Sequence, residues 1–468
     1  MKQEVINPNW TIESLKTVLS PLLKEVRGTS ERSFFSVSTD TRHLAAGEIF
    51  VALRGERFDG HDYALEAEKR GAGALVLDHS VGASCPEIIV KDTLEAYGAL
   101  ACAWRRQFHI PLICVTGSNG KTTTTQMIGS ILREAAAPED ILCTEGNLNN
   151  EIGVPKMLLK LCPQTRLAVI EAGMNHPGEM ARLAGWIRPS VVVVTNAQRE
   201  HQAYIDGIEG SARENAMAIV ALPEEGTAVL PLADPCFKIW HGFARARGCF
   251  LTTYSAKESD AQICAIRRGA SLVIRTPQGN IETTLQMAGE HAVHDAAAAA
   301  AAAMAAGVDL GSIARGIAAF KPVKGRGRMH FFENGALLID ESYNANPDSV
   351  RAAIDVLAQM PSPRILVIGE MGELGDKSDA YHREIVHYAR SKGIERLLSI
   401  GEKFRGVYSE FGENAEFFES REALCSAVQH SFISPCSLLV KASHYMRLDL
   451  VVDAALSQNT MTDKTKEK

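Results

Sequence analysis

The sequence predicts an α/β protein of three domains. Two observations lead to this fold class. Short apolar runs of strand length alternate with helical stretches along most of the chain, as in sheets that are covered by helices. A basic segment at 321–328, broken by Gly and Pro, interrupts this alternation and is the clearest domain boundary. Because 468 residues are too many for one hydrophobic core, we expect domains at 1–108, 109–322 and 323–468.

The first domain is expected to be a small α/β unit. Residues 49–53 and 74–77 are apolar runs typical of strands, and a helical stretch at 63–70 separates them. A polar turn with one acid and one base precedes the first run: Asp40, Thr41 and Arg42. Such a turn is more often a solvated loop than a binding site, so the residues alone leave both interpretations open.

The central domain is organised around residues 110–123, IPLICVTGSNGKTT. Its apolar first half is typical of a buried parallel strand. The glycines that follow allow successive backbone N–H groups to face phosphate oxygens. Lys121 adds a positive charge for the outer phosphates, and the Thr122 hydroxyl can bind Mg²⁺. A helix expected at 123–133 points its positive end at the same place.

This pattern is a shortened P-loop, since Val115 stands where the usual spacing has a glycine. A glycine-rich turn with a surface lysine is the alternative interpretation. The order of strand, glycines, Lys-Thr and helix favours a nucleoside triphosphate site. The expected contacts are Thr116, Gly117, Ser118, Asn119, Gly120, Lys121, Thr122 and Thr123.

Two further strands are expected in the same sheet, at 167–173 and 190–196. Glu171 lies at the carboxyl end of the first, where ligands collect in open parallel sheets, so we predict that it holds Mg²⁺ directly or through water. His201 follows the second strand and is a candidate metal ligand, although it could be a surface residue. A polar loop expected at the same edge contains Asn149 and Asn150.

The alanine-rich stretch 291–306 is expected to be a helix, because alanine has the highest helix propensity. A low-complexity linker is the alternative. Asp295 lies in the first turn, where an acidic side chain favours the helix dipole. Such a helix start could face a nucleotide base, although spacing alone indicates this weakly.

The C-terminal domain is expected to be a parallel, Rossmann-like α/β unit without a second P-loop. Its strands are expected at 336–339, 365–368, 397–400 and 438–440, and its helices at 348–360, 380–391, 422–429 and 448–456.

Composition limits the classes of function. The net charge of −7 argues against a nucleic-acid surface, because no basic block offsets it. No apolar stretch approaches the ~18–20 residues of a membrane span, and the N-terminus lacks the apolar region of a signal peptide. Ten cysteines, most of them inside apolar runs and none in a CxxC pair, indicate reduced thiols. We therefore expect a cytoplasmic protein, and also a monomer.

Taken together, these segments resemble the Mur ligases, which form amide bonds at the expense of ATP in peptidoglycan precursor synthesis. The resemblance covers all three expected domains. Its most specific segments are TGSNGKTT, GNLNNEIGVP at 146–155, IEAGMNHPGE at 170–179 and DESYNANPDS at 340–349. The last is typical of family members that add D-alanyl-D-alanine to UDP-N-acetylmuramoyl-tripeptide. GEMGELG at 369–375 also resembles their C-terminal domain.

The resemblance implies a role for each matching residue, with ATP and Mg²⁺ as cofactors. Catalysis would involve Lys121, Glu171 and His201, and the metal would be held by Thr122, Glu171 and His201. Nucleotide contacts beyond the P-loop would come from Asp295, Arg326 and Asp340. Substrate contacts would come from Asp40, Thr41, Arg42, Asn149, Asn150, Asn344 and Asn346. The domain at 1–108 would bind the UDP-sugar, and the domain at 323–468 would close on the site.

The chain departs from the family pattern at three places. Asn215 stands where many members carry a carbamylated lysine, so a second metal would need another ligand, such as Glu214 or water. Asp295 stands where the family usually has an asparagine that reads adenine, and an ionised aspartate could not donate to a ring nitrogen. KASH at 441–444 replaces the common K-G-S-R, which affects the expected contact with the dipeptide carboxylate.

The chemistry expected from this site is activation of a carboxylate by phosphoryl transfer, followed by attack of an amine on the acyl phosphate. A sister ligase that adds one amino acid is the nearest alternative, but the diaminopimelate-reading motif D-N-P-R is absent. A P-loop ATPase that forms no bond and a degenerate regulatory relative are further alternatives.

Overall fold

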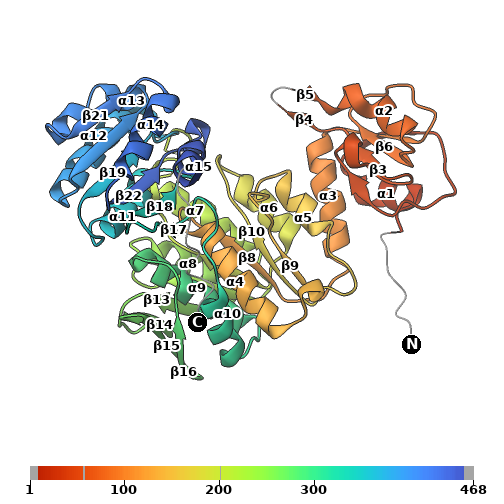
Figure 1. The fold of residues 1–468 in the computed structure, drawn as a ribbon. Helices are drawn as coiled ribbons and strands as arrows, with labels where there is room; N and C mark the ends of the chain where they lie inside the picture. Colours follow the sequence, from red (N-terminus) through yellow and green to blue (C-terminus); the bar gives the residue numbers. More distant parts are fainter. Residues whose placement is uncertain (1–8, 56–57, 201, 458–468) are drawn as a thin grey trace.

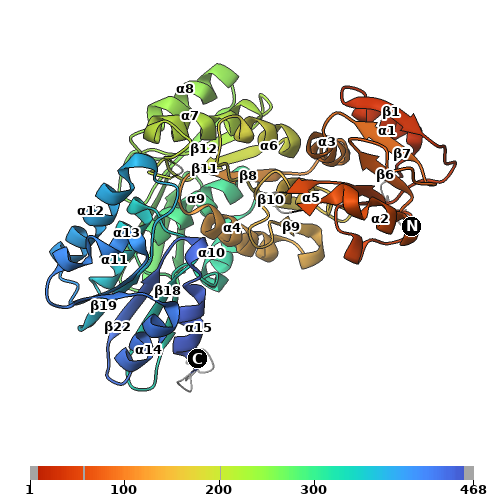
Figure 2. The ribbon, with the colours of Figure 1, turned by 90° about the horizontal axis from the view of Figure 1, so that it is seen from above.

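The structure is a computed structural model that describes residues 9–55, 58–200 and 202–457. Within these ranges the chain forms three large β-sheets of five, nine and six strands. In Figure 1 the N-terminal sheet (red) lies at one end of the molecule, the C-terminal sheet (blue) at the other, and the nine-stranded sheet between them. Figure 2 shows the same order from above. The α/β class and the three domains predicted from the sequence are therefore confirmed.

The N-terminal domain contains the five-stranded sheet, in the order β1-β7-β6-β3-β2, and a separate β4–β5 hairpin. Parallel pairs join the strands from β7 to β2, and β1 adds an antiparallel edge. The elements are α1 (Ile12–Leu19), β1 (Leu23–Arg27), β2 (Val37–Ser38), η1 (Thr41–His43), β3 (Ile49–Val51), β4 (Arg54–Gly55), β5 (Phe58–Asp59), η2 (Gly60–Tyr63), α2 (Ala64–Lys69), β6 (Ala74–Leu77), β7 (Glu87–Val90) and α3 (Thr93–Arg105).

Helix α3 joins the first two domains and lies between them in Figure 1. It packs against α5 and α6 of the central domain as well as against α1. Gly98 allows the close approach, because a Cβ there would lie 2.1 Å from the ring of Trp186. Trp104 Nε1 and Arg105 Nε donate across the same interface to backbone carbonyls, at 2.9 and 3.1 Å. The hydrophobic core is therefore continuous across the expected boundary at residue 108.

The central domain is built on the nine-stranded sheet, in the order β16-β15-β14-β13-β12-β11-β8-β10-β9. Strands from β9 to β14 pair in parallel, and β15 and β16 extend the edge as an antiparallel hairpin that the sequence analysis did not anticipate. The elements are β8 (Leu112–Thr116), α4 (Lys121–Ala135), η3 (Pro138–Asp140), β9 (Ile141–Cys143), α5 (Gly153–Leu158), β10 (Leu167–Glu171), α6 (Glu179–Ile187), β11 (Val191–Val194), α7 (Gly207–Val220), β12 (Thr227–Pro231), α8 (Phe237–Arg247), β13 (Phe250–Ser255), β14 (Ile263–Arg268), β15 (Ser271–Thr276), β16 (Gly279–Thr284), α9 (Glu290–Ala305) and α10 (Leu310–Ala319).

Helices cover both faces of this sheet, because alternate strand residues point to opposite sides. Ile113 and Val115 of β8 share one core with α4, α9 and α10, whereas Leu112 and Cys114 share the other with α3, α6 and α7. The alanine-rich segment is α9, and residues 296–303 are fully buried. Their small side chains let the helix pack closely on the sheet, so the linker interpretation was wrong.

The C-terminal domain contains the six-stranded sheet, in the order β17-β18-β22-β19-β20-β21. All strand pairs are parallel except the antiparallel pair β17–β18 at the edge. The parallel pairs agree with the prediction of a parallel, Rossmann-like sheet. The elements are β17 (Arg328–Phe331), β18 (Leu337–Glu341), α11 (Pro347–Leu357), β19 (Arg364–Ile368), η4 (Gly375–Lys377), α12 (Ser378–Ser391), β20 (Arg396–Ile400), α13 (Glu402–Arg405), η5 (Tyr408–Phe411), β21 (Ala415–Phe418), α14 (Arg421–Ser431), β22 (Ser437–Lys441), η6 (His444–Met446) and α15 (Asp449–Ser457).

Among the described residues, each of the three predicted domain ranges contains one large sheet. No helix in this part of the chain has the length and apolarity needed to cross a bilayer. Every helix and strand expected after residue 323 has a counterpart in the structure. The strands β17 and β21 were missed.

Candidate active site

A cavity of about 1090 Å³ lies where the three domains meet. The carboxyl ends of β8 and β10 open into it, which is where ligands bind in parallel α/β sheets. Most of the predicted site residues form its wall: Ser118, Asn119, Gly120, Lys121, Thr122, Thr123, Asn149, Asn150, Glu171, Asp295, Arg326, Asn344 and Asn346.

The loop between β8 and α4 has the conformation of a phosphate-binding loop. Gly117 and Gly120 have φ values of +123° and +82°, which side chains rarely adopt. A Cβ at Gly117 would lie 2.2 Å from Thr195 Oγ1, and one at Gly120 would lie 2.4 Å from Asp295 Oδ1. The sequence therefore needs glycine at both positions. Thr116 and Gly117 lie beneath the loop rather than in the cavity wall.

Lys121 folds back over this loop. Its Nζ donates to the backbone oxygens of Gly117 and Ser118, at 2.5 and 2.9 Å, and lies 3.4 Å from Glu200 Oε2. Helix α4 begins at the same residue, two positions earlier than predicted. A positive charge and a helix N-terminus thus face the cavity together, as an anion of high charge requires.

Glu171 is buried at the end of β10 and faces Thr122. Its Oε1 accepts hydrogen bonds from Thr122 Oγ1 at 3.0 Å and Asn149 Nδ2 at 2.7 Å. Its Oε2 is buried and accepts no hydrogen bond from the described residues. A buried carboxylate oxygen without a partner is costly unless a ligand supplies one. Carboxylate and hydroxyl oxygens suit Mg²⁺, so this pair fits the predicted metal. His201, the third predicted ligand, lies outside the described residues.

Asp295 is buried against the P-loop at Gly120. Burial raises the pKa of this carboxyl well above its ordinary value, and the attraction of Arg326 opposes only part of the effect. A protonated carboxyl group has one donor and one acceptor, like the amide of asparagine. The objection that aspartate cannot donate to a purine ring nitrogen therefore holds only for the ionised form, which this environment disfavours.

Arg326 and Asp340 approach the cavity from the C-terminal domain in different ways. Arg326 lies in the wall, with its guanidinium 4.1 Å from the centre of the Tyr343 ring. Asp340 is fully buried behind the wall, where it accepts hydrogen bonds from Gly325 N and from Ser342 N and Oγ. In this arrangement Asp340 orders the turn that carries Arg326.

The remaining asparagines hold loops at the rim of the cavity. Asn149 contacts Glu171, whereas Asn150 Oδ1 accepts from the backbone N–H groups of Ile152 and Gly153 at the start of α5. Asn344 Oδ1 accepts from the next backbone N–H at 2.9 Å. Asn346 caps α11 and also exchanges hydrogen bonds with Asn119 of the P-loop.

Asn215, the expected departure from the family pattern, and Glu214, considered above as a ligand of a second metal, both bind other groups in the structure. Asn215 Oδ1 accepts from Thr116 Oγ1 at 2.7 Å and from Gly117 N at 3.1 Å, and its side chain is buried. Glu214 accepts from two backbone N–H groups at the start of α6, at 2.8 and 3.1 Å. Neither side chain lies in the cavity wall. Asn215 therefore ties α7 to the start of the P-loop.

Asp40, Thr41 and Arg42 are not part of the wall of the main cavity. Asp40 caps η1, and the Arg42 guanidinium binds both of its carboxylate oxygens, at 2.9 and 2.8 Å. This hydrogen bonding holds the pKa of Asp40 below its ordinary range. Asp40 and Arg42 therefore pair with each other within the turn, and the turn does not line the cavity at the P-loop.

Several further wall residues come from the N-terminal and C-terminal domains. Arg54 comes from β4 of the N-terminal domain, and Glu341 follows Asp340 in β18. Lys441 at the end of β22 is buried, donates to Asn344 O at 2.7 Å and lies 3.5 Å from Glu341. Burial lowers the pKa of Lys441. Lys441 belongs to the segment KASH, which was discussed from the sequence, whereas Arg54 and Glu341 were missed, and the approach of Arg54 depends on domain packing.

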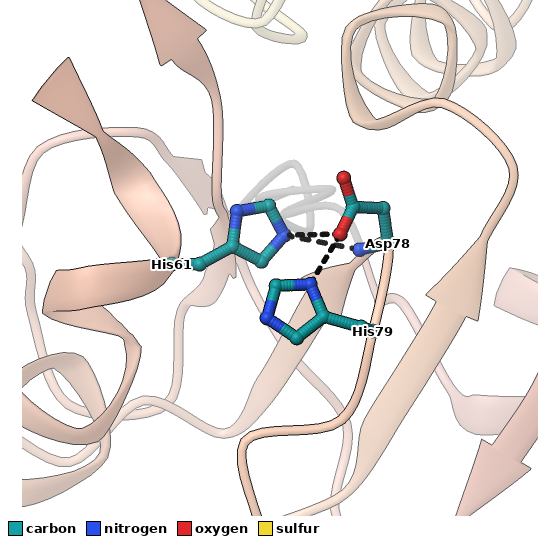
Figure 3. A group of neighbouring side chains, drawn as sticks. All are labelled: His61, Asp78 and His79. Atoms are coloured by element: carbon teal, nitrogen blue, oxygen red, sulfur yellow. Dashed lines mark hydrogen bonds and ion pairs between the residues drawn. The ribbon is translucent and has the colours of Figure 1, made fainter.

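A second polar cluster lies in the N-terminal domain. Figure 3 shows His61 and His79 next to each other, both reaching Asp78, whose Oδ1 lies 3.2 Å from His61 Nε2 and 2.5 Å from His79 Nδ1. The Asp78 backbone N–H already donates to His61 Nε2, and Arg54 Nη1 lies 2.7 Å from Asp78 Oδ2. Because protein groups occupy these atoms and Arg54 supplies a positive charge, we interpret the cluster as a structural link between η2 and the segment that follows β6.

The comparison with protein families matches three segments. Residues 34–105 match the description "Mur ligase family, catalytic domain", residues 115–303 match "Mur ligase middle domain", and residues 327–444 match "Mur ligase, glutamate ligase domain". Each segment lies within one of the three domains described above.

Relatives match over nearly the whole chain. The UDP-N-acetylmuramoyl-tripeptide–D-alanyl-D-alanine ligase of Escherichia coli (strain K12) is 37% identical over 430 residues, which are 91% of this chain and 94% of that protein. The ligase of the same name from Bacillus subtilis (strain 168) is 31% identical, covering 94% and 98%.

Solved structures agree with these matches. A crystal structure of MurF from Acinetobacter baumannii has a TM-score of 0.88 at 29% identity and covers 97% of this chain and 100% of that one. The MurF ligase from Thermotoga maritima in complex with ADP has a TM-score of 0.79 at 21% identity, which supports the fold alone. The P-loop cavity, the three matched segments and these relatives together show that this chain belongs to the Mur ligase family.

Proposed function

We propose that this protein is an ADP-forming ligase that joins D-alanyl-D-alanine to UDP-N-acetylmuramoyl-tripeptide in peptidoglycan precursor synthesis. One observation carries the proposal. The P-loop and the Thr122–Glu171 pair face the same cavity as Asn344 and Asn346 of the segment DESYNANPDS. Relatives named for this reaction match the chain over more than nine tenths of its length.

The proposal assigns one task to each domain. Residues 1–108 bind the UDP-sugar, residues 109–322 bind ATP, and residues 323–468 close over the site. The shared cavity supports this division, since its wall includes residues from all three ranges. Nucleotide contacts are assigned to the P-loop, Asp295 and Arg326. Asp340 is assigned an indirect role, because it holds the turn that carries Arg326. Substrate contacts are assigned to Asp40, Thr41, Arg42, Asn149, Asn150, Asn344 and Asn346.

The first chemical step is attack of the tripeptide carboxylate on the γ-phosphorus of ATP. Lys121 and the backbone N–H groups of the P-loop, which line the cavity, would stabilise the charge that develops on the phosphate oxygens. Thr122, Glu171 and His201 would hold Mg²⁺, which neutralises phosphate charge. The products of this step are ADP and an acyl phosphate.

In the second step the amino group of the dipeptide attacks the acyl carbon, and a tetrahedral adduct collapses to the amide and phosphate. Water must be excluded, because the acyl phosphate would otherwise hydrolyse. The C-terminal domain is the part of the chain that can close the cavity over the P-loop. Lys441 contributes a buried positive group near Asn344, where a dipeptide carboxylate could bind.

The proposal includes a monomer in the cytoplasm. A monomer suffices because one chain supplies the whole cavity wall described above. A cytoplasmic setting follows from the need for ATP. Light scattering after gel filtration and fractionation of cells test these two points.

The function is tested by measuring phosphate release with UDP-N-acetylmuramoyl-tripeptide and a varied second substrate. Release that requires D-alanyl-D-alanine, with a product whose mass equals the sum of both substrates minus water, is the expected result. Release with single amino acids instead would identify a sister ligase. Release of phosphate without any acceptor would indicate an ATPase that forms no bond.

A further inference from the structure

A short segment after β11, residues 196–200, connects the P-loop with the C-terminal domain. On the P-loop side, Asn196 Oδ1 accepts from Asn119 N at 2.9 Å, and Gln198 Oε1 accepts from Asn119 Nδ2 at 2.5 Å. Gln198 N also donates to Ser118 Oγ at 2.9 Å. The position of this segment therefore fixes the backbone and side chain of the P-loop at Asn119.

On the other side, Arg199 is held by two carboxylates of the C-terminal domain. Asp348, at the start of α11, accepts from the Arg199 backbone N–H at 2.9 Å and from Nη2 at 2.6 Å. Glu384 of α12 accepts from Nη1 at 2.8 Å and from Nη2 at 3.2 Å. The guanidinium also lies 5.0 Å from the centre of the Tyr381 ring. One central-domain side chain thus contacts two helices of the neighbouring domain.

The geometry is that of a strong ion pair rather than a surface contact. The side chain of Arg199 is 18% exposed, and those of Asp348 and Glu384 are 23% and 30% exposed. Paired hydrogen bonds from a planar guanidinium to carboxylates are shorter and stronger than single ones. Partial burial also reduces screening by salt. The contact is therefore expected to hold the two domains in one relative position.

A second contact links the P-loop to the same helix directly. Asn346, the cap of α11, donates from Nδ2 to Asn119 Oδ1 at 2.8 Å and accepts from Asn119 Nδ2 at 3.2 Å. Asn346 lies two residues before Asp348. When Arg199 holds Asp348, the start of α11 is consequently placed beside Asn119.

We propose that Arg199 is a positioning residue that seats the C-terminal domain on the P-loop and thereby favours the nucleotide-bound, closed state. Arg199 acts through Asp348 and Glu384 and is not itself part of the cavity wall. If nucleotide binds the closed state better, contacts that favour this state must also strengthen nucleotide binding. The effect on activity rests on the proposed function, whereas the effect on nucleotide binding does not.

Glu384 provides the sharpest test, because it contacts Arg199 and lies outside the cavity wall. The variants are Arg199→Ala, Arg199→Lys and Glu384→Gln. Lysine keeps the charge but cannot form the paired hydrogen bonds, so its effect should be intermediate. Arg364→Lys is the matched control, since Arg364 forms a similar pair with Glu395 inside the C-terminal domain, with a shortest contact of 2.7 Å.

Three measurements are made on each full-length variant. Calorimetry gives the affinity for a non-hydrolysable ATP analogue with Mg²⁺, small-angle scattering gives the radius of gyration with that analogue bound, and thermal unfolding reports stability. We expect Arg199→Ala and Glu384→Gln to bind the analogue at least about fivefold more weakly and to have a larger radius of gyration. The kcat/KM for the dipeptide should fall at least about tenfold, or ~1.4 kcal/mol.

Arg364→Lys should leave affinity, radius of gyration and kcat/KM unchanged even if its stability falls. Unchanged affinity and scattering in both Arg199→Ala and Glu384→Gln would overturn the proposal, and so would equal changes in Arg364→Lys. If binding and scattering respond as expected but no ligation occurs in any form of the protein, the positioning role stands and the proposed function fails.

Discussion

Replacing Glu171 with Gln removes the charge of the proposed metal ligand while keeping its shape. The amide oxygen can occupy the place of Oε1 and still accept from Thr122 Oγ1 and Asn149 Nδ2. The amide nitrogen then takes the place of Oε2, which is buried and has no hydrogen-bond partner among the described residues. The change therefore acts on the one oxygen that a cation would need.

The expected effects on folding and on activity differ in size. The two hydrogen bonds that Oε1 accepts change from charged to neutral, which costs about 1 kcal/mol each. In return, the free-energy penalty for burying a charge is removed. We expect the free energy of unfolding to change by less than about 2 kcal/mol. Loss of the metal ligand should cost several kcal/mol of transition-state stabilisation, and ~2.7 kcal/mol would lower kcat/KM roughly 100-fold.

The assay is phosphate release as a function of Mg²⁺ concentration, with Glu151→Gln as the control. Glu151 also lies in the cavity wall, but it pairs with Arg182 and has no place in the proposed metal site. Glu171→Gln should need far more Mg²⁺ for half-maximal activity, whereas the control should not. If Glu171→Gln matched the unmodified protein at every Mg²⁺ concentration, Glu171 would be a structural acid at the end of a strand.

Three further changes have expected outcomes. Lys121→Ala should lower the ligation rate more than tenfold, or ~1.4 kcal/mol, without unfolding the protein, and a retained rate above about a tenth would contradict its contact with the transferred phosphate. Burial raises the pKa of Asp295, so the folded state binds the extra proton and loses stability as pH rises from the ordinary range of aspartate through the folded pKa. Asp295→Asn should therefore gain stability relative to the unmodified protein with increasing pH in denaturant titrations, and a constant difference would show an ionised carboxylate. Because Asn215 has no amine to carbamylate, activity should survive removal of dissolved CO₂; recovery upon addition of bicarbonate would mean that another lysine carries this group.

The parts of the site's geometry that the sequence anticipated depend on local sequence. The strand, the glycines and Lys121 lie within 14 residues, from 110 to 123, and the glycines have the backbone conformation that this order implies. The contact between Thr122 and Glu171 was also predictable. Strands β8 and β10 are neighbours, so residues at their carboxyl ends must lie close together.

The parts that were missed depend on the direction of a side chain or on packing between domains. Position 215 was interpreted as a departure from the family pattern, but only the structure shows that Asn215 turns toward Thr116. Asp340 was expected at the nucleotide, yet nearby Gly325 and Ser342 take its oxygens. Arg199 was not recognised, because its partners lie 149 and 185 residues further along the chain.

The β15–β16 hairpin was missed for a different reason. Strand β15 alternates between buried and less buried side chains, and β16 at the edge of the sheet buries only Ile281, so both lack the continuous apolar runs of the central strands. A period of two residues at 271–276 was the available signal, with Leu272 and Ile274 facing the core.

The most direct test of the account follows oxygen from the tripeptide to phosphate. The account requires the tripeptide carboxylate to attack the γ-phosphorus, so one of its oxygens must leave with the phosphate when the amide forms. With ¹⁸O in both oxygens of that carboxylate, mass spectrometry of the phosphate released in the presence of D-alanyl-D-alanine should show one ¹⁸O atom in each molecule. Phosphate without ¹⁸O would mean that water attacks ATP, and it would contradict the proposed ligase chemistry.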